Sequence, residues 1–306
     1  MQNTSVENKL QLRVGLSIVI VAVKDNMPKV FIIRKDKLKA LPFGNFDPAE
    51  HSTLEKGLLS WVEDQTPIKV RYLEQLYTFS NKIRYTRETC GTPYRFLSIG
   101  YLALTDQLDF EISESIFFNC WYRFFPWEDW REGEPKVLST EIIPELRKWS
   151  NDDKEKNLRV DICFGQNAYN WGESKTLQRY ELLYEAKLVA EYYIDNDLPI
   201  PENIITSEYM DKDHRRILAT AIGRLRRKLK YKPVIYELMP EEFTLLKLQN
   251  AVETLMGKTL HKQNFRRLVE SSGMVEPIEG KTSNESGGRP AALFRFKRDV
   301  AFDHFI

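Results

Sequence analysis

The N-terminal part of the chain carries short apolar segments with β-strand character. Residues 14–24 (VGLSIVIVAVK) and 29–34 (KVFIIR) are rich in β-branched residues, and the DNMP between them predicts a turn. These two segments therefore predict a β-hairpin. After it, Ser52 is expected to cap a helix over residues 53–64, and Pro67 helps to end that helix.

Two more strands are predicted at residues 72–79 and 96–104, with a polar loop between them. The block FFNCWYRFFPWEDW that follows is so aromatic that most of it must be buried. Strands, one helix and more strands indicate a mixed α+β domain, which we expect to span residues 1–130.

Residues 131–205 are predicted to be mainly helical. Between residues 175 and 195, apolar side chains recur every three or four positions around a stripe too wide for one face. This pattern predicts a single helix covered on two sides, either by a second subunit or by the core of the same chain. The segment LPIPENIITS then indicates a linker, because its prolines stop the helix.

Residues 206–306 show the order of elements typical of a winged helix-turn-helix. The first helix, over residues 211–231, places Leu218, Ile222, Leu225 and Leu229 on one face. Five basic side chains remain for its other faces: Arg215, Arg216, Arg226, Arg227 and Lys230. The segment PVIYELMP then predicts a short strand.

Two helices and a hairpin complete this C-terminal region. The first of these helices has Thr244 as its expected N-cap, Phe243 packed on Leu248, and Gly257 at its end. The other, HKQNFRRLVESSG, is predicted to turn three apolar side chains inward: Phe265, Leu268 and Val269. The last segment, MVEPIEGKTSNESGGRPAALFRFK, predicts two strands joined by a glycine-rich tip.

The charge of the chain is unevenly distributed. The net charge is only +1, but residues 211–306 contain 19 Lys+Arg and 12 Asp+Glu, a net charge of +7, and residues 1–210 have a net charge of −6. A basic C-terminal third on an acidic body indicates a polyanionic partner. The alternative is that these basic residues only solvate helix surfaces.

The cysteines and the hydropathy of the chain predict its cellular location. The three cysteines are scattered without metal-site spacing and cannot all pair, so neither a disulfide framework nor a zinc site is predicted. The longest apolar run is too short to cross a bilayer, and the first residues lack a signal-peptide pattern. We expect a soluble cytoplasmic protein without a membrane partner.

The winged-helix pattern predicts a DNA-binding surface. The helix from His261 is expected to lie in the major groove and the hairpin tip to reach the neighbouring backbone or minor groove. The side chains expected to contact DNA are Lys262, Gln263, Asn264, Arg266, Arg267, Lys281 and Arg289. Gln, Asn and Arg pair with base edges, whereas Lys mainly neutralises phosphate. A protein-binding adaptor with the same fold remains an alternative.

Residues 41–65 (LPFGNFDPAEHSTLEKGLLSWVEDQ) resemble half of the signature of Nudix hydrolases. Gly44 and Glu50 fit the first part of the signature. In its second part, Leu58 and Leu59 stand where the family has Arg-Glu, Val62 replaces a Glu and Gln65 replaces a Gly. Of the later carboxylates only Glu63 is present. Positions 59, 62 and 63 share one helix face, where the carboxylates of the family hold Mg²⁺ against a diphosphate.

The losses argue against hydrolysis. Leu59 and Val62 make that face apolar, and without a metal ion neither water nor the leaving phosphate is activated. We therefore predict no catalytic residues, no metal site and no enzymatic activity. A Mg²⁺-dependent Nudix hydrolase of a nucleoside diphosphate derivative, using Glu63 with neighbouring acids, is the alternative.

The scaffold still offers a nucleotide cleft. The loop between the strands at 72–79 and 96–104 carries Arg84, Arg87 and Arg95, which could meet phosphates, and Tyr85 or Tyr94 could stack on a base. We list the three arginines and Glu63 as candidate ligand-binding residues. A solvated loop position is the alternative for each of them.

Taken together, the segments resemble the Nudix-related transcriptional regulators of NAD metabolism of the NrtR and NadQ kind. The resemblance runs nearly end to end, through LPFGNFDPAE, YLEQLYTF, RYELLYEAKLVAEYY, AIGRLRRKLKYKPVIYELMPEEFTLLKLQNAVE, KQNFRRLVE and GGRPAALFRF. It implies an N-terminal Nudix-like α/β/α sandwich, a helical middle segment and a C-terminal winged helix-turn-helix.

The resemblance also implies a function. Regulators of this kind are homodimeric repressors that bind a palindromic operator of NAD biosynthesis or salvage genes. Their Nudix-like domain senses a nucleotide such as ADP-ribose or ATP. A regulatory nucleotide is therefore expected, and a catalytic cofactor is not.

Overall fold

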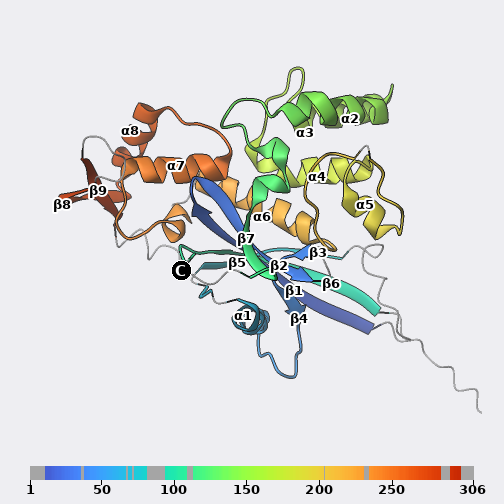
Figure 1. Cartoon of the computed structure of the whole chain (residues 1–306), viewed down its shortest axis with the longest axis horizontal. Coiled ribbons are helices and arrows are strands. Elements are labelled where there is room, and N and C mark those ends of the chain that lie inside the picture. The colour runs from blue at the N-terminus through green and yellow to red at the C-terminus, as the bar shows by residue number, and fades with distance from the viewer. Residues whose placement is uncertain are drawn as a thin grey trace, which may run out of the picture.

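A mixed sheet forms the centre of the molecule (Figure 1). The computed structural model describes residues 11–35, 38–66, 68–70, 72–80, 94–108, 113–202, 204–230, 234–283 and 290–297. Within this part of the chain the sheet has seven strands: β1 (Gln11–Lys24), β2 (Met27–Lys35), β3 (Leu38–Ala40), β4 (Phe43–Asn45), β5 (Tyr72–Phe79), β6 (Tyr94–Leu104) and β7 (Ile116–Cys120). Their order is β3-β2-β1-β6-β5, and β4 and β7 pair with β1 and β2.

The predicted hairpin is confirmed as β1 and β2. The two strands are antiparallel, with Val21 opposite Val30. Asp25 and Asn26, both at φ 54, make the tight turn between them, a conformation that short Asp and Asn side chains tolerate. The strand predicted at residues 72–79 is β5, and the one predicted at 96–104 is β6, which runs parallel to β1.

Both faces of the sheet are covered by helices, because β1 is apolar on both sides. Leu16, Ile18 and Ile20 join the core beneath α1 (Leu54–Gln65), and Val19 and Val21 join the larger core on the opposite face. Figure 1 shows α1 on one side of the sheet and α6 on the other. The predicted α/β/α sandwich is therefore confirmed. The cap of α1 is Thr53 rather than the expected Ser52, since the Thr53 hydroxyl accepts a hydrogen bond from Lys56 N.

The middle region packs short helices on the larger core. They are η1 (Trp121–Arg123), η2 (Pro126–Glu128), the π-helical turn η3 (Leu138–Ile142), α2 (Ile143–Ser150), α3 (Lys154–Phe164), η4 (Glu173–Lys175), α4 (Thr176–Glu185) and α5 (Ala190–Asp195). The aromatic block, which contains η1 and η2, is buried as predicted, with Trp121, Phe124, Phe125 and Trp127 fully inaccessible. None of the described helices has the length and apolar character needed to span a bilayer.

The single helix predicted over residues 175–195 is wrong. It is divided into α4 and α5 at Lys187, which has φ 61, and Leu188 N bonds back to Leu183 O at 2.9 Å. The break lets Leu188 and Val189 enter the core beside Tyr180. The core of the same chain therefore buries Tyr180 and Leu188 of the apolar stripe along this segment.

The C-terminal elements are α6 (His214–Leu229), η5 (Val234–Leu238), α7 (Leu245–Met256), α8 (Lys262–Ser272), β8 (Val275–Ser283) and β9 (Ala291–Phe296). Thr244 caps α7 as predicted, and Gly257 ends it at φ 70. The strand predicted at PVIYELMP is instead the 3₁₀ turn η5, in which Met239 N bonds to Tyr236 O. The third strand of the winged helix is reduced to a bridge between Phe243 and Phe294.

Two arginines of α6 are inside the protein, contrary to the expectation that they lie on its outer faces. Arg215 and Arg226 are fully buried. Arg215 donates to the buried Glu191 carboxylate at 3.0 Å, and Arg226 donates to the Glu128 carboxylate at 2.5 Å. Part of the positive charge of the C-terminal third is therefore neutralised by acids from earlier regions.

Glu128 joins all three regions of the chain. Its carboxylate accepts two hydrogen bonds from Arg179 of α4, at 2.6 and 2.9 Å, and one from Arg226 of α6. Burial alone raises the pKa of Glu128, but the two guanidinium groups outweigh this effect and hold its pKa below the usual range. Arg226 also donates to Leu255 O at 2.9 Å, so α7 is attached to the same ion cluster.

Gly257 lets α7 end against this cluster. A Cβ atom at Gly257 would lie 2.3 Å from Glu128 O, and its φ of 70 is strained for any other residue type. Trp130 N donates to Gly257 O at 2.7 Å. The end of α7 is thus fixed by backbone contacts as well as by Arg226.

Replacing Glu128 with Gln should destabilise the protein strongly. The variant leaves Arg179 and Arg226 buried without a carboxylate, and losing one partner of a buried ion cluster costs about 3–5 kcal/mol. We expect a loss of that size in the free energy of unfolding, measured by urea denaturation. Glu145→Gln, which removes a surface pair with Lys148 at 2.6 Å, is the matched control and should cost less than about 1 kcal/mol. Equal stability of the two variants would contradict the assigned role of Glu128.

Candidate nucleic-acid interface and nucleotide pocket

Helix α8 presents a polar face to solvent. Phe265 and Val269, one turn apart, are buried against the rest of the C-terminal region. The structure places all five side chains predicted to contact DNA from this helix on its exposed surface: Lys262, Gln263, Asn264, Arg266 and Arg267. Arg266 pairs with Glu270 at 2.9 Å, one turn along the same surface. The helix therefore carries donors for base edges and phosphates on a surface that the described part of the chain leaves exposed.

Leu268 was expected to turn inward and does not. Its side chain is 66% exposed, because a helix held only through Phe265 and Val269 buries a narrow stripe. Leu268 nevertheless lines one cavity together with Val275 of β8 and Phe296 of β9.

Strands β8 and β9 form the antiparallel wing. The wing is attached to the start of α7 by two backbone hydrogen bonds between Phe243 and Phe294, at 3.0 and 2.8 Å. Lys281 is exposed near the end of β8 and pairs with Glu242 at 2.5 Å. The predicted DNA contact Arg289 lies outside the described residues.

The helix of the Nudix-like segment has an apolar inner face. Leu58 and Val62 are buried beneath the sheet, Leu59 is half-buried, and Glu63 is exposed. Two of the residues that replace family carboxylate or arginine positions are thus core residues. Among the described residues, no group of three or more His, Cys, Asp and Glu side chains is placed to hold a metal ion.

Two residues of α1, Trp61 and Gln65, hold the loop to the helix. A Cβ atom at Gly44 would lie 2.1 Å from the Trp61 ring, so the glycine allows the indole to pack flat on β4. Trp61 Nε1 donates to Asn45 O at 2.9 Å. Gln65 donates to Phe43 O at 2.8 Å and accepts from Phe43 N at 3.3 Å. These hydrogen bonds connect the loop to α1.

A cavity of about 460 Å³ opens beside this loop. It is lined by Leu12, Arg13, Val14, Asn45, Phe46, Asp47 and Pro48. The loop is ordered by its own contacts, since Asp47 Oδ1 accepts from Ala49 N at 2.8 Å and His51 Nδ1 accepts from Asp47 N at 3.1 Å. An exposed arginine, an aromatic ring and a carboxylate on one cavity suit a phosphate, a base and a ribose.

The predicted ligand residues only partly coincide with this cavity. Arg84 and Arg87 lie outside the described residues, and Arg95 lies in β6, where its side chain is not described. Glu63 is not among the lining residues. Arg13 was missed, although strand register provides a signal: its neighbour Leu12 pairs with Arg95, so both arginines lie at the same end of the sheet.

The start of α6 contacts the segment that leads into this loop. His214 Nδ1 accepts a hydrogen bond from Leu41 N at 3.3 Å, and its ring lies 5.0 Å from that of Phe43. Asp211 N donates to Lys39 O at 2.8 Å. Burial, with a smaller contribution from Lys212, lowers the pKa of His214 to about 3. One helix therefore connects the segment leading into the loop after β4, at its start, to α7 at its end.

Comparison with known proteins places these elements in a known architecture. Residues 235–296 match the family model of the NrtR DNA-binding winged helix domain. The structure of Shewanella oneidensis NrtR has a TM-score of 0.56 with 20% identity, and the structure of the same protein complexed with a 27mer DNA has a TM-score of 0.53 with 21% identity. Each match covers 94% of this chain and 95% of the other. The chain has the NrtR fold.

A relative from Acinetobacter baylyi is 44% identical over 84 residues and bears the name ADPR responsive transcriptional repressor NtrR. The match covers 28% of this chain and 33% of the relative, so it spans about a third of the relative's length. The NrtR fold thus combines the Nudix-like sheet with the winged helix, as the sequence resemblance implied.

Replacing His214 with Gln should remove part of the acid sensitivity of the protein. In the folded state the pKa of His214, about 3, lies below its ordinary value of 6.5. The contribution of His214 to the free energy of unfolding is therefore fully present above pH 6.5 and falls as the pH drops toward 3. Between pH 6.5 and pH 3 the unfolded state binds a proton at His214 that the folded state does not bind. The free energy of unfolding therefore falls by about 1.4 kcal/mol for each pH unit.

The measurement is urea denaturation of the wild type and His214→Gln at several values of pH between 3 and 7. The variant keeps a hydrogen-bond acceptor for Leu41 N but does not titrate. His261→Gln, at the exposed start of α8, is the control and should keep the wild-type slope. Parallel pH profiles for wild type and His214→Gln would contradict the buried neutral state of His214.

Proposed function

We propose that the protein is a transcriptional repressor of NAD biosynthesis or salvage genes, which binds operator DNA and responds to an adenine nucleotide such as ADP-ribose. The observation that carries the proposal is the exposed polar face of α8 within the segment matched by the NrtR winged-helix model. The name of the Acinetobacter relative supports both repression and a response to ADP-ribose.

On DNA, α8 is the recognition helix. Gln263, Asn264, Arg266 and Arg267 contact base edges and phosphates in the major groove, and Lys262 neutralises phosphate. Lys281 and Arg289 bring the wing to the neighbouring backbone. A homodimer places two such helices on the half-sites of a palindrome, about one helical turn apart. The repressor acts in the cytoplasm, where its operator lies.

The nucleotide occupies the cavity beside Asn45–Pro48. Arg13 binds its diphosphate, together with arginines of the loop between β5 and β6, and Phe46 stacks on its base. The segment 1–130 is then the sensor, 131–205 the connecting segment, and 206–306 the DNA-binding region. The ligand acts as an effector, and no catalytic cofactor is involved.

Helix α6 transmits the signal. Nucleotide binding acts on the loop that follows β4. The first residue of β4 is Phe43, whose ring contacts that of His214 at the start of α6. At its other end α6 holds α7 through the bond from Arg226 to Leu255 O. A ligand changes operator affinity only if it prefers one arrangement of these elements over another. This continuous helix provides a route for such a preference.

The same site has lost the features of a hydrolase. Leu58 and Val62 are core residues, and the exposed Glu63 has no described acidic cluster around it. Carboxylates that gather Mg²⁺ at a diphosphate are therefore not supplied by α1. We assign sensing without turnover to this domain.

Arg266→Ala and Arg267→Ala should each weaken operator binding by about 5- to 150-fold. Loss of a base contact costs about 1–3 kcal/mol, and loss of a phosphate contact lowers the salt dependence of binding. Gel shifts with upstream regions of NAD genes, over a range of salt concentrations, measure both effects. Lys154→Ala, an exposed cation in α3, is the control and should bind like wild type. Absence of salt-sensitive binding by the wild type at sub-micromolar protein would exclude the repressor.

Arg13→Ala should weaken ADP-ribose binding by about tenfold or more. A hydrogen bond between charged groups contributes about 1.5–3 kcal/mol, and the variant removes such a bond to phosphate. Calorimetric titration measures the affinity, and Arg34→Ala, an exposed arginine of β2, is the control. Operator binding without nucleotide should be unchanged in both variants.

The same samples test the hydrolase. With Mg²⁺ and ADP-ribose we expect no release of AMP. Release of AMP by the wild type that is abolished in Glu63→Gln would show that the domain is an enzyme and not a sensor. Wild-type affinity in Arg13→Ala would place the nucleotide elsewhere.

A further inference from the structure

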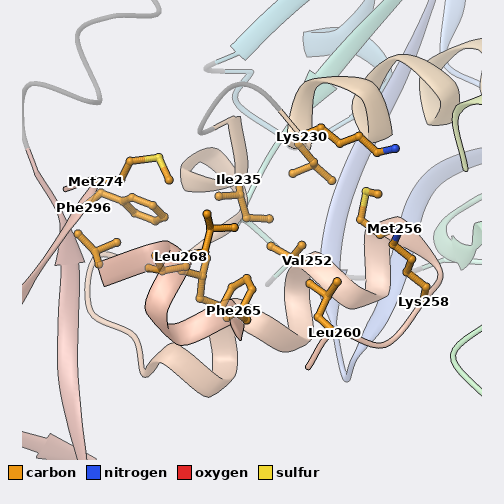
Figure 2. A pocket seen from close by; sticks show the side chains of 14 residues that line it. Lys230, Ile235, Val252, Met256, Lys258, Leu260, Phe265, Leu268, Met274 and Phe296 are labelled. Carbon is orange, nitrogen blue, oxygen red and sulfur yellow. The ribbon is translucent and has the colours of Figure 1, made fainter. Parts of the chain in front are cut away.

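A second cavity lies inside the C-terminal region, far along the chain from the nucleotide loop (Figure 2). Its volume is about 330 Å³, and its walls come from the end of α6, η5, α7, α8 and the wing. Of the 14 residues that line it, 12 are apolar and the other two are Lys230 and Lys258. An apolar cavity with a few polar groups at one end is the usual form of a small-molecule site.

The cavity has two chemically different ends. In Figure 2, Lys230 and Lys258 lie near Met256, whereas Met274 and Phe296 lie at the opposite end, with Leu268 beside them. Leu268, exposed on α8, is thus a wall residue of this cavity rather than an isolated surface side chain. A molecule bound along the cavity would meet cations at one end and only hydrocarbon at the other.

Both lysines are bound to one carboxylate. Lys230 pairs with Glu173 Oε2 at 3.0 Å, and Lys258 pairs with Glu173 Oε1. Burial alone raises the pKa of Glu173, but these hydrogen bonds outweigh it and lower the pKa to about 2. The nearby Glu253 is engaged elsewhere, since it accepts from Leu260 N at 2.7 Å and Gln249 at 2.8 Å. Each lysine side chain is about 40% exposed, and its ammonium group has three N–H donors, so it keeps donors for a further anion.

We propose that this cavity binds a small amphiphilic anion, with its acidic head at Lys230 and Lys258 and its apolar body between α7, α8 and the wing. The size fits, since a cavity of about 150 Å³ holds one benzene ring, and 330 Å³ is about twice that volume. A medium-length acyl carboxylate or a bicyclic aromatic acid has these properties. A nucleotide does not, because its ribose and phosphates would face Leu248, Val252 and Phe265.

The position of the site ties it to the DNA-binding surface. Phe265 and Val269 are the residues through which α8 is buried, and both line the cavity. A ligand there fixes the distance of α8 from α7. At the head group, Glu173 is adjacent to the central ion cluster, because its carbonyl accepts from Arg226 at 3.1 Å. This site is therefore distinct from the nucleotide cavity and acts on the opposite end of α6.

The test uses the full chain without DNA, so its outcome is independent of the proposed repressor function. The probe is 1-anilinonaphthalene-8-sulfonate, an anionic bicyclic dye whose fluorescence rises on binding, and the competitors are octanoate, octanol and octylamine. We expect octanoate to displace the dye at a concentration about fivefold or more below that of octanol, because each exposed ion pair adds up to about 1 kcal/mol. Octylamine should compete least.

Variants assign the two ends separately. Lys230→Gln and Lys258→Gln should each abolish the preference for octanoate over octanol, while Lys247→Gln, on the exposed side of α7, should keep it. Val252→Phe fills the cavity and should weaken dye binding at least tenfold, whereas Leu246→Phe on the outer side of the same helix should not. Thermal melting shows whether Val252→Phe is folded, and the lysine variants decide the question if it is not.

Two results would overturn the proposal. One is displacement of the dye at equal concentrations of the three competitors, which would show that the site does not distinguish the charge of the head group. The other is dye binding that survives in both lysine variants with an unchanged preference for octanoate, which would place the dye outside this cavity.

Discussion

The arrangement of this molecule depends on one buried carboxylate. Glu128 lies in the aromatic segment after the sheet, and its two oxygens hold Arg179 of the middle region and Arg226 of α6. Isolated charges are costly to bury, so each group is tolerated only because the others are in place. Remaining donors of Arg179 reach Cys163 O and Gly172 O, and its guanidinium lies 3.7 Å from the Trp171 ring. The segment after the sheet, the middle helices and the C-terminal region are therefore held together by the same buried ion cluster.

Local signals in the sequence predicted much of the fold. The β1–β2 hairpin, the strand β5 and the caps of α7 follow from residues that are neighbours in the chain, and those predictions were confirmed. Interactions between distant segments could not be predicted in this way. An amphipathic pattern assigns Arg215 and Arg226 to solvent, because it contains no information about Glu191 and Glu128. The break at Lys187 was missed for the same reason, since it is stabilised by core contacts of Leu188 and Val189.

For the candidate sites, too, features formed by neighbouring residues could be predicted from the sequence and features formed by distant residues could not. A recognition helix is visible in the sequence because polar and apolar positions alternate with helical period over α8, so its exposed face could be listed in advance. The candidate nucleotide cavity could not, because Arg13 and Phe46 are brought together only by the pairing of β1 with β4. The prediction of changed chemistry in the altered Nudix segment stays a prediction, and the hydrogen bonds of Trp61 and Gln65 to the neighbouring loop become evident only in three dimensions.

The contact of Gly257 with Glu128 O has a consequence for the modular use of this domain. The segment 235–296 that matches the winged-helix model contains α7, α8 and the wing, but not Arg226 or Glu128. Cut out or fused to another sensor, it would expose Leu255 O, Gly257 and the apolar surface that α6 covers. The winged-helix segment of this protein is therefore not portable as a separate unit, and natural recombination would have to exchange α6 and the aromatic segment together with it.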